Sequence, residues 1–196
     1  MMLAAIVLAA GRGSRFRAEA GADQDKLLAD CVGRDGVMRP VIEQVLVNLP
    51  DRLMARWLVT TPDRTEIIRL AQAYGCQVLL LQSAGMGESI AAAVAASASA
   101  DGWLVVLGDM PFIQSSSIER VIDALEEDGI SVPVQAGDYG HPVAFGRAFG
   151  PDLMALTGDR GGKPLFARVR VREVQVEDAG VLWDVDLPKR LNFSAD

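Results

Sequence analysis

Two glycines and two arginines follow the first apolar segment of this 196-residue chain, and their spacing favours the binding of an anion. Gly11 and Gly13 lack a Cβ atom, so the loop can present backbone N–H groups to a ligand at close range. Arg12 and Arg15 add positive charge beside them. These residue types would suit a nucleotide phosphate chain; the alternative is an ordinary tight turn at the end of a strand.

Two well-known phosphate-binding motifs do not fit this loop. A dinucleotide-binding Gly-x-Gly-x-x-Gly motif would require glycine where Phe16 stands, with a helix that begins on the motif. Residues 17–25 contain Gly21 and show little helical periodicity, and no Gly-Lys-Ser/Thr follows at the P-loop spacing. The missing third glycine therefore disfavours an NAD-dependent oxidoreductase.

Carboxylates that could hold a divalent metal stand at two further places. Asp109 directly follows an apolar run, and a carboxylate fixed at a strand end suits Mg²⁺ that bridges to nucleotide phosphates. Asp184 and Asp186 alternate in a strand-like segment, so they would point to opposite faces and one could reach the same metal. Structural alternatives exist, because Asp109 could turn the chain before Pro111 and Asp186 could cap a helix.

Lys26 is a cation among acidic and apolar neighbours. A lysine in such a place is usually a solvated surface charge. Its position shortly after the glycine-arginine loop favours a phosphate contact instead.

The elements that must position these residues alternate between strands and helices. We expect strands within residues 1–10 and at 56–61, 76–81 and 103–107, and helices at 40–49, 62–74, 87–97 and 115–127. Pro40 is expected in the first turn of its helix, Gly75 after the end of the next, and Ser115 or Ser116 as a cap. This order predicts a three-layer α/β/α, Rossmann-like fold with a mostly parallel sheet.

The alternation breaks after residue 129. Short strands are expected at 130–134, 142–145, 172–176 and 181–185, with helices at 151–157, after 163 and from 187. No linker interrupts the chain, so residues 1–196 are predicted to form one domain. Ligands bind beyond the carboxyl ends of strands in open parallel sheets, which draws attention to the loops at 11–16, 82–89, 108–112, 137–142 and 158–163.

Composition excludes several classes of function. The formal net charge of −7 argues against a nucleic-acid partner, because a phosphate backbone requires a basic surface. Cys31 and Cys76 form neither a disulfide framework nor a metal cluster and are expected to be reduced thiols. The first apolar run is too short to cross a membrane and no basic segment precedes it, so a cytoplasmic protein with no membrane partner is expected.

Taken in order, these motifs resemble the MobA/MocA-type nucleotidyltransferases, which attach CMP or GMP to molybdopterin. The resemblance covers essentially the whole chain, and the Ala-Ala-Gly and Gly-His-Pro segments lean toward the cytidylyltransferase branch. It implies a fold like that of nucleotide-diphospho-sugar transferases. The segments that carry it are Leu8–Gly11, Ser14–Phe16 with Lys26, Gly85–Ser89, Gly108–Pro111, Gly140–Pro142, Gly158–Lys163 and Asp184–Pro188.

The resemblance also implies roles for individual residues. Catalytic roles would belong to Arg15, Lys26 and Asp109, with Asp109 and Asp186 as ligands of Mg²⁺. Gly140, His141 and Pro142 would face the acceptor. Nucleotide binding would involve Leu8, Ala9, Ala10, Gly11, Gly13, Arg15, Lys26, Gly85, Met86, Ser89 and Asp109.

One departure from the family pattern concerns Lys26. Arg17 stands where a glycine is usual, and several extra residues precede the lysine.

The implied reaction is transfer of CMP from CTP to the phosphate of a molybdopterin-type acceptor, with release of pyrophosphate. A molybdoenzyme or its maturation chaperone would be a further partner. The alternatives are GTP or another NTP as donor, a sugar or polyol phosphate as acceptor, and a non-catalytic nucleotide-binding partner of a molybdoenzyme maturation system.

Overall fold

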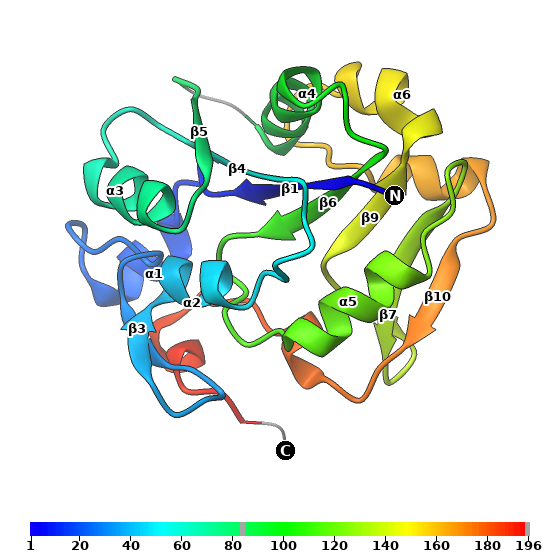
Figure 1. The fold of residues 1–196 in the computed structure, drawn as a ribbon. Helices are drawn as coiled ribbons and strands as arrows, with labels where there is room; N and C mark the ends of the chain where they lie inside the picture. Colours follow the sequence, from blue (N-terminus) through cyan, green and yellow to red (C-terminus); the bar gives the residue numbers. More distant parts are fainter. Residues whose placement is uncertain (83–84, 195–196) are drawn as a thin grey trace.

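Strand β1 (Leu3–Leu8) lies at the centre of the sheet in the computed structural model, which describes residues 1–82 and 85–194 (Figure 1). It pairs in parallel with β4 (Ala55–Thr60) on one side and β6 (Gly102–Leu107) on the other. All of its residues but the last are buried. A strand covered on both faces is apolar throughout, which explains the unbroken apolar run.

The sheet is mixed but mostly parallel, as predicted. Its order is β10-β7-β9-β6-β1-β4-β5, with β8 paired to β7. Strand β9 runs antiparallel to both β6 and β7, while β10 runs parallel to β7. The remaining strands are β5 (Gln77–Leu80), β7 (Ile130–Gln135), β8 (Asp138–Tyr139), β9 (Val143–Gly146) and β10 (Arg172–Gln175).

Helices cover both faces of the sheet, which confirms the three-layer prediction (Figure 1). Leu3, Ala5 and Val7 of β1 pack on one face with α2 (Val41–Val47), α3 (Thr65–Ala73) and α5 (Ser115–Asp123). The alternate residues of β1 pack on the other face with α4 (Met86–Ala96) and α6 (Gly150–Met154). The period of two along β1 therefore divides the core into two halves.

The segment after the first loop differs from expectation. Helix α1 (Ser14–Ala20) begins directly after Gly13, where little helical periodicity was found. Only Phe16 of this helix is buried, so its sequence carries no repeating apolar face. A short hairpin of β2 (Asp30–Val32) and β3 (Met38–Pro40) then leads into α2, with Pro40 as its N-cap residue rather than inside its first turn.

The strand predicted at 181–185 is wrong. The 3₁₀ turn η3 (Ala179–Leu182) takes its place, because the buried carboxylate of Asp178 accepts a hydrogen bond from the Gly180 N–H. Asp184 and Asp186 are thus not on opposite faces of a strand. The other late turns are η1 (Arg147–Phe149), η2 (Lys163–Arg168) and η4 (Pro188–Leu191), and the latter two stand where short helices were expected.

Two helix starts also differ. Helix α3 begins at Thr65, since residues 61–64 form a turn in which the Arg64 N–H bonds to the Thr61 carbonyl. Helix α5 has Gln114 as its N-cap, and the Asp178 carboxylate accepts from the Gln114 N–H and the Ser117 hydroxyl. A side chain distant in sequence therefore supplies the cap that a local serine was expected to supply.

The expectations for Gly75 and for the two cysteines hold. Gly75 follows α3 with a positive φ of 73°, a conformation that favours glycine at a helix C-terminus. Cys31 and Cys76 are buried free thiols, and burial raises the pKa of each to about 11. Within residues 1–82 and 85–194, no helix has the length and apolar character needed to cross a membrane.

Candidate functional site

The carboxyl ends of β1 and β6 lie side by side, and the chain leaves them in different directions. The chain passes from β1 to β4 and β5 on one side, then crosses over through α4 to β6 on the other. Such a reversal of strand order opens a crevice at the carboxyl edge of a parallel sheet. The loop 9–13 follows β1 here, and Asp109 follows β6, so the topology brings the two predicted motifs together.

Lys26 joins two carboxylates at this edge. Its Nζ atom lies 2.6 Å from Asp109 Oδ2 and 3.0 Å from Asp186 Oδ1, partners that stand 83 and 160 positions away in the chain. Burial alone would lower the pKa of Lys26, but the two carboxylates outweigh it and raise the pKa above 10.5. Lys26 is therefore a charged ammonium, and the structure places all three predicted residues in one cluster.

Arg15 completes this cluster from the solvent side. The Arg15 side chain is 78% exposed, and its guanidinium donates to Asp186 Oδ2 at 3.0 Å. Burial opposes ionisation of Asp186, but hydrogen bonds from Lys26 and nearby positive charge lower its pKa below 3.8. Burial and the neighbouring Asp186 raise the pKa of Asp184, which Arg190 holds at 3.3 Å. Three cations, Lys26, Arg15 and Arg190, thus meet three carboxylates at one edge of the sheet.

A cavity of about 820 Å³ opens beside this cluster. Ser89 lies on its wall and is buried, while the Arg12 side chain borders the cavity from the loop. Gly13 follows the lining residue Arg12 in the chain, but neither Gly13 nor Arg15 lines the cavity. The predicted nucleotide-binding residues that do line it are Leu8, Ala9, Ala10, Gly11, Lys26, Gly85, Met86, Ser89 and Asp109.

The far wall of this first cavity depends on close backbone contact. A Cβ atom on Gly85 would lie 2.3 Å from the Gly158 carbonyl oxygen, so only glycine fits there. The Gly87 N–H donates to the same oxygen at 2.8 Å, and the Gly158 N–H donates to Glu88. That last bond lowers the pKa of Glu88. Ser83 and Ala84, which belong to the predicted loop 82–89, lie outside the described residues.

A second cavity of about 320 Å³ adjoins the first, and Met86 lines both. Its wall is mainly apolar, with Phe145, Phe166 and Ile90, and its predicted residues are Gly140 and His141. Pro142 is buried next to them but does not line the cavity. A further cavity of about 810 Å³ is lined by residues at the start of β7 and β10 and by Phe166, and it contains none of the predicted residues.

His141 keeps some exposed surface, but its Nδ1 atom is buried and has no hydrogen-bond partner within the described residues. Burial lowers its pKa from 6.5 to about 4, although the charge of Asp109 acts in the opposite direction. The imidazole is therefore neutral at physiological pH. It presents an unpaired polar atom in an otherwise apolar setting.

This shift predicts a pH-dependent loss of stability. The unfolded imidazole binds a proton below its ordinary pKa of 6.5, whereas the folded one resists protonation down to about 4. Stability should thus fall as the pH decreases from 6.5 toward 4, by about 1 to 2 kcal/mol at about pH 5 from this group alone. Urea unfolding of the parent and of His141→Gln at several pH values measures this difference.

His141 is the only histidine in the chain, so no other imidazole contributes. The His141→Gln protein should lose less stability than the parent between about pH 7 and about pH 5. Equal pH slopes for the two proteins would contradict the shifted pKa.

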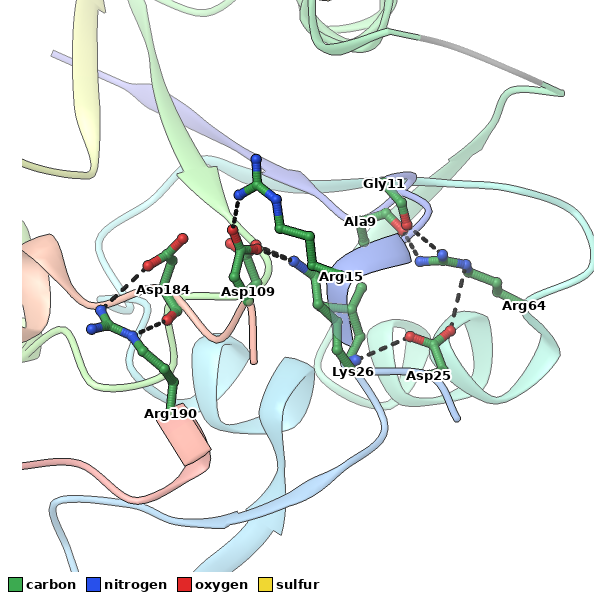
Figure 2. Close-up of polar contacts among 11 residues, drawn as sticks. Ala9, Gly11, Arg15, Asp25, Lys26, Arg64, Asp109, Asp184 and Arg190 are labelled. Carbon is green, nitrogen blue, oxygen red and sulfur yellow. Dashed lines mark hydrogen bonds and ion pairs between the residues drawn. The ribbon is translucent and has the colours of Figure 1, made fainter. Parts of the chain in front are cut away.

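Arg64 and Asp25 are the main site residues that the sequence reasoning missed. The Arg64 guanidinium donates to the Ala9 and Gly11 carbonyl oxygens and pairs with Asp25, the residue before Lys26 (Figure 2). The available signal was positional: Arg64 follows a predicted strand that pairs with β1, at the carboxyl edge of the sheet.

Comparison with known proteins gives a family match. The model of the MobA-like NTP transferase domain family matches residues 5–175. The bifunctional protein GlmU of Sphingopyxis alaskensis is 30% identical over 149 residues, which cover 74% of this chain and 31% of that protein. The chain spans less than half the length of the curated relatives it matches first.

Solved structures share the fold over nearly the full length. Rv0371c from Mycobacterium tuberculosis is 26% identical with a TM-score of 0.77, covering 97% of this chain and 95% of that one. The same protein has been solved in complex with manganese. A nucleotidyl transferase from Methanothermobacter, Mth528, is 23% identical with a TM-score of 0.78 and covers 96% of this chain and 94% of that one.

Proposed function

Because this chain belongs to the family of MobA-like NTP transferase domains, we propose that it transfers CMP from CTP to the phosphate of a molybdopterin-type acceptor. Pyrophosphate is the second product. The observation that carries the proposal is the meeting of Lys26, Asp109 and Asp186 beside a glycine loop and a cavity. Residues 1–196 would act as one transferase domain.

Asp109 and Asp186 fit a divalent cation such as Mg²⁺. Their carboxylates share one ammonium group, so they lie close enough to share a metal ion, and oxygen ligands are those that Mg²⁺ prefers. Within the described ranges no three His, Cys, Asp or Glu side chains form a metal-binding group. Two carboxylates suffice for a metal that also takes phosphate oxygens and water. That Rv0371c, which shares the fold, has been solved in complex with manganese supports a divalent ion in this proposal.

The reaction would join two polyanions, which repel each other, and the cations of this chain would reduce that repulsion. An oxygen of the acceptor phosphate forms a bond to the α-phosphorus of CTP, and the bond from that phosphorus to the pyrophosphate oxygen breaks. A bound divalent metal supplies charge neutralisation on the phosphates. Lys26 and Arg15 neutralise further charge and hold the reactants in line. No general base is needed, since the attacking phosphate is already ionised near neutral pH.

The second cavity supports an acceptor that has an apolar or ring-shaped part. Phe145, Phe166 and Ile90 offer apolar contact, and the neutral His141 offers one polar atom. Gly140 and Pro142 flank this histidine and would shape the acceptor side of the site. The first and second cavities meet at Met86, so an acceptor there would adjoin the nucleotide.

Other substrates of the same chemistry compete with this proposal. GTP or another NTP could supply the nucleotidyl group, and a sugar or polyol phosphate could accept it, because transfer requires only a phosphate oxygen as the attacking group. A molybdoenzyme or its maturation chaperone would receive the product under the first proposal.

The test is pyrophosphate release with each of the four NTPs and Mg²⁺, with and without molybdopterin. We expect turnover with CTP and molybdopterin together, and none with either alone. Turnover with GTP would show that the donor is not CTP alone, and turnover only with sugar or polyol phosphates would show that the acceptor is not molybdopterin. Tight NTP binding without release from any mixture would instead indicate a non-catalytic binding partner.

A further inference from the structure

Arg64 is held beside the loop that follows β1 by the turn at residues 61–64. Its side chain is only 8% exposed, although it carries a charge. The turn follows β4, which pairs in parallel with β1, so the two carboxyl ends and their loops are neighbours. A buried guanidinium requires several partners, and those of Arg64 show what it holds in place.

Two of these partners are backbone carbonyl oxygens in the loop. Arg64 Nη1 donates to the Ala9 oxygen at 2.7 Å, and Nη2 donates to the Gly11 oxygen at 2.5 Å. A trans peptide directs its N–H opposite to its C=O. The N–H groups of Ala10 and Arg12 therefore point away from Arg64. Among the described residues, neither N–H donates to a protein acceptor, and both residues line the first cavity.

The third partner joins the loop to the turn that carries Lys26. Arg64 Nε lies 3.6 Å from Asp25 Oδ2, while Asp25 Oδ1 accepts the Leu27 N–H at 3.0 Å. The Asp25 carbonyl oxygen also accepts from the Leu28 N–H at 3.0 Å. Asp25 thus closes the turn around Lys26, and Arg64 connects this turn to the loop (Figure 2).

We propose that Arg64 is a positioning residue for the triphosphate. It holds the Ala9 and Gly11 carbonyls so that free N–H groups face the nucleotide phosphates, and through Asp25 it holds Lys26 at a fixed distance from them. This inference rests on the proposed nucleotidyl transfer. Only arginine has a planar fork that serves two carbonyls and a carboxylate at once, so lysine should not replace it.

The experiment compares CTP and CMP binding, with Mg²⁺, to the parent, Arg64→Met and Arg64→Lys proteins by titration calorimetry. We expect both variants to bind CTP about 10- to 100-fold more weakly than the parent, with CMP affinity changed less than about threefold. Damage that was only structural would weaken both nucleotides alike. Arg69→Met is the matched control, because Arg69 lies on α3 and, among the residues that the structure describes, its exposed side chain pairs only with Glu66.

The outcomes separate this inference from the proposed function. If the parent binds no NTP, the proposed function fails and the inference fails with it. If the parent binds CTP and folded Arg64 variants bind it equally well, or lose CTP and CMP alike, only the positioning role is overturned. Should Arg64→Met fail to fold, Asp25→Asn tests the contact between Arg64 and Asp25. This variant should also bind CTP more weakly while its affinity for CMP changes little. Unchanged CTP affinity of Asp25→Asn would overturn the link from Arg64 to Lys26.

Discussion

The Asp109→Ala protein is expected to release pyrophosphate at least about 1,000-fold more slowly than the parent while keeping its fold, which corresponds to about 4 kcal/mol of lost transition-state stabilisation. Asp109 stands two residues after the end of β6 and is one of two carboxylates around Lys26. Its removal takes away half of the oxygen pair proposed for the metal and leaves Lys26 with Asp186 alone. The rate is measured by a coupled pyrophosphate assay at saturating Mg²⁺ and substrate.

A surface aspartate provides the control for this change. Asp123 is the last residue of helix α5, is largely exposed and pairs with Arg52. It does not line the first cavity. Asp123→Ala should retain the parental rate. Thermal melting checks that both variants are folded, and a folded Asp109→Ala protein with the parental rate would eliminate Asp109 as a metal ligand.

The Lys26→Met protein should show two opposite effects. Its pyrophosphate release should fall by at least about 100-fold, since a cation at the phosphates is lost. In the absence of nucleotide, however, it should bind Mn²⁺ about tenfold more tightly than the parent. The reason is that Lys26 neutralises the Asp109 and Asp186 carboxylates in the free protein, so a metal must compete with its ammonium group for them.

Electron paramagnetic resonance of free Mn²⁺ measures this affinity directly, without turnover. Lys189→Met serves as the control, because Lys189 is exposed on η4 and is not ion-paired in the described structure. Metal-free Lys26→Met should also melt at a lower temperature than the parent, and Mn²⁺ should raise its melting temperature by the larger amount. Equal or weaker Mn²⁺ binding by the variant would show that Lys26 does not compete for this pair.

The sequence predicted correctly those elements whose structure depends mainly on their own residues. The apolar run of β1 and the order of strands and helices were enough to predict the three-layer fold, and strand ends indicated the loop 9–13 and Asp109. Asp109 and the loop were expected at one sheet edge because parallel strands share their carboxyl ends. Lys26 was proposed from its position shortly after the loop and from the family resemblance, and the structure places its side chain beside Gly13.

The features that were missed depend on contacts between distant segments. Asp178 converts a predicted strand into a 3₁₀ turn and caps α5, and no local pattern in its neighbours records those partners. Arg64 was expected inside the helix predicted at 62–74, and its role depends on β4 lying beside β1. The 181–185 segment is a short, mostly apolar run typical of a strand, but it is not paired within the sheet that the described residues form.

Met86 has a consequence for how this protein could acquire new substrates. It lies between the two cavities, and a Cβ atom on Gly161 would lie only 2.6 Å from its sulfur atom. Because methionine is flexible, the boundary can change shape without a change in the backbone. Shortening this one side chain would merge two chambers into one, whereas the Gly85–Gly158 backbone contact cannot change without disturbing both segments. Under the proposed function, the size of the acceptor could therefore change through single substitutions, while the proposed nucleotide side of the site is constrained against them.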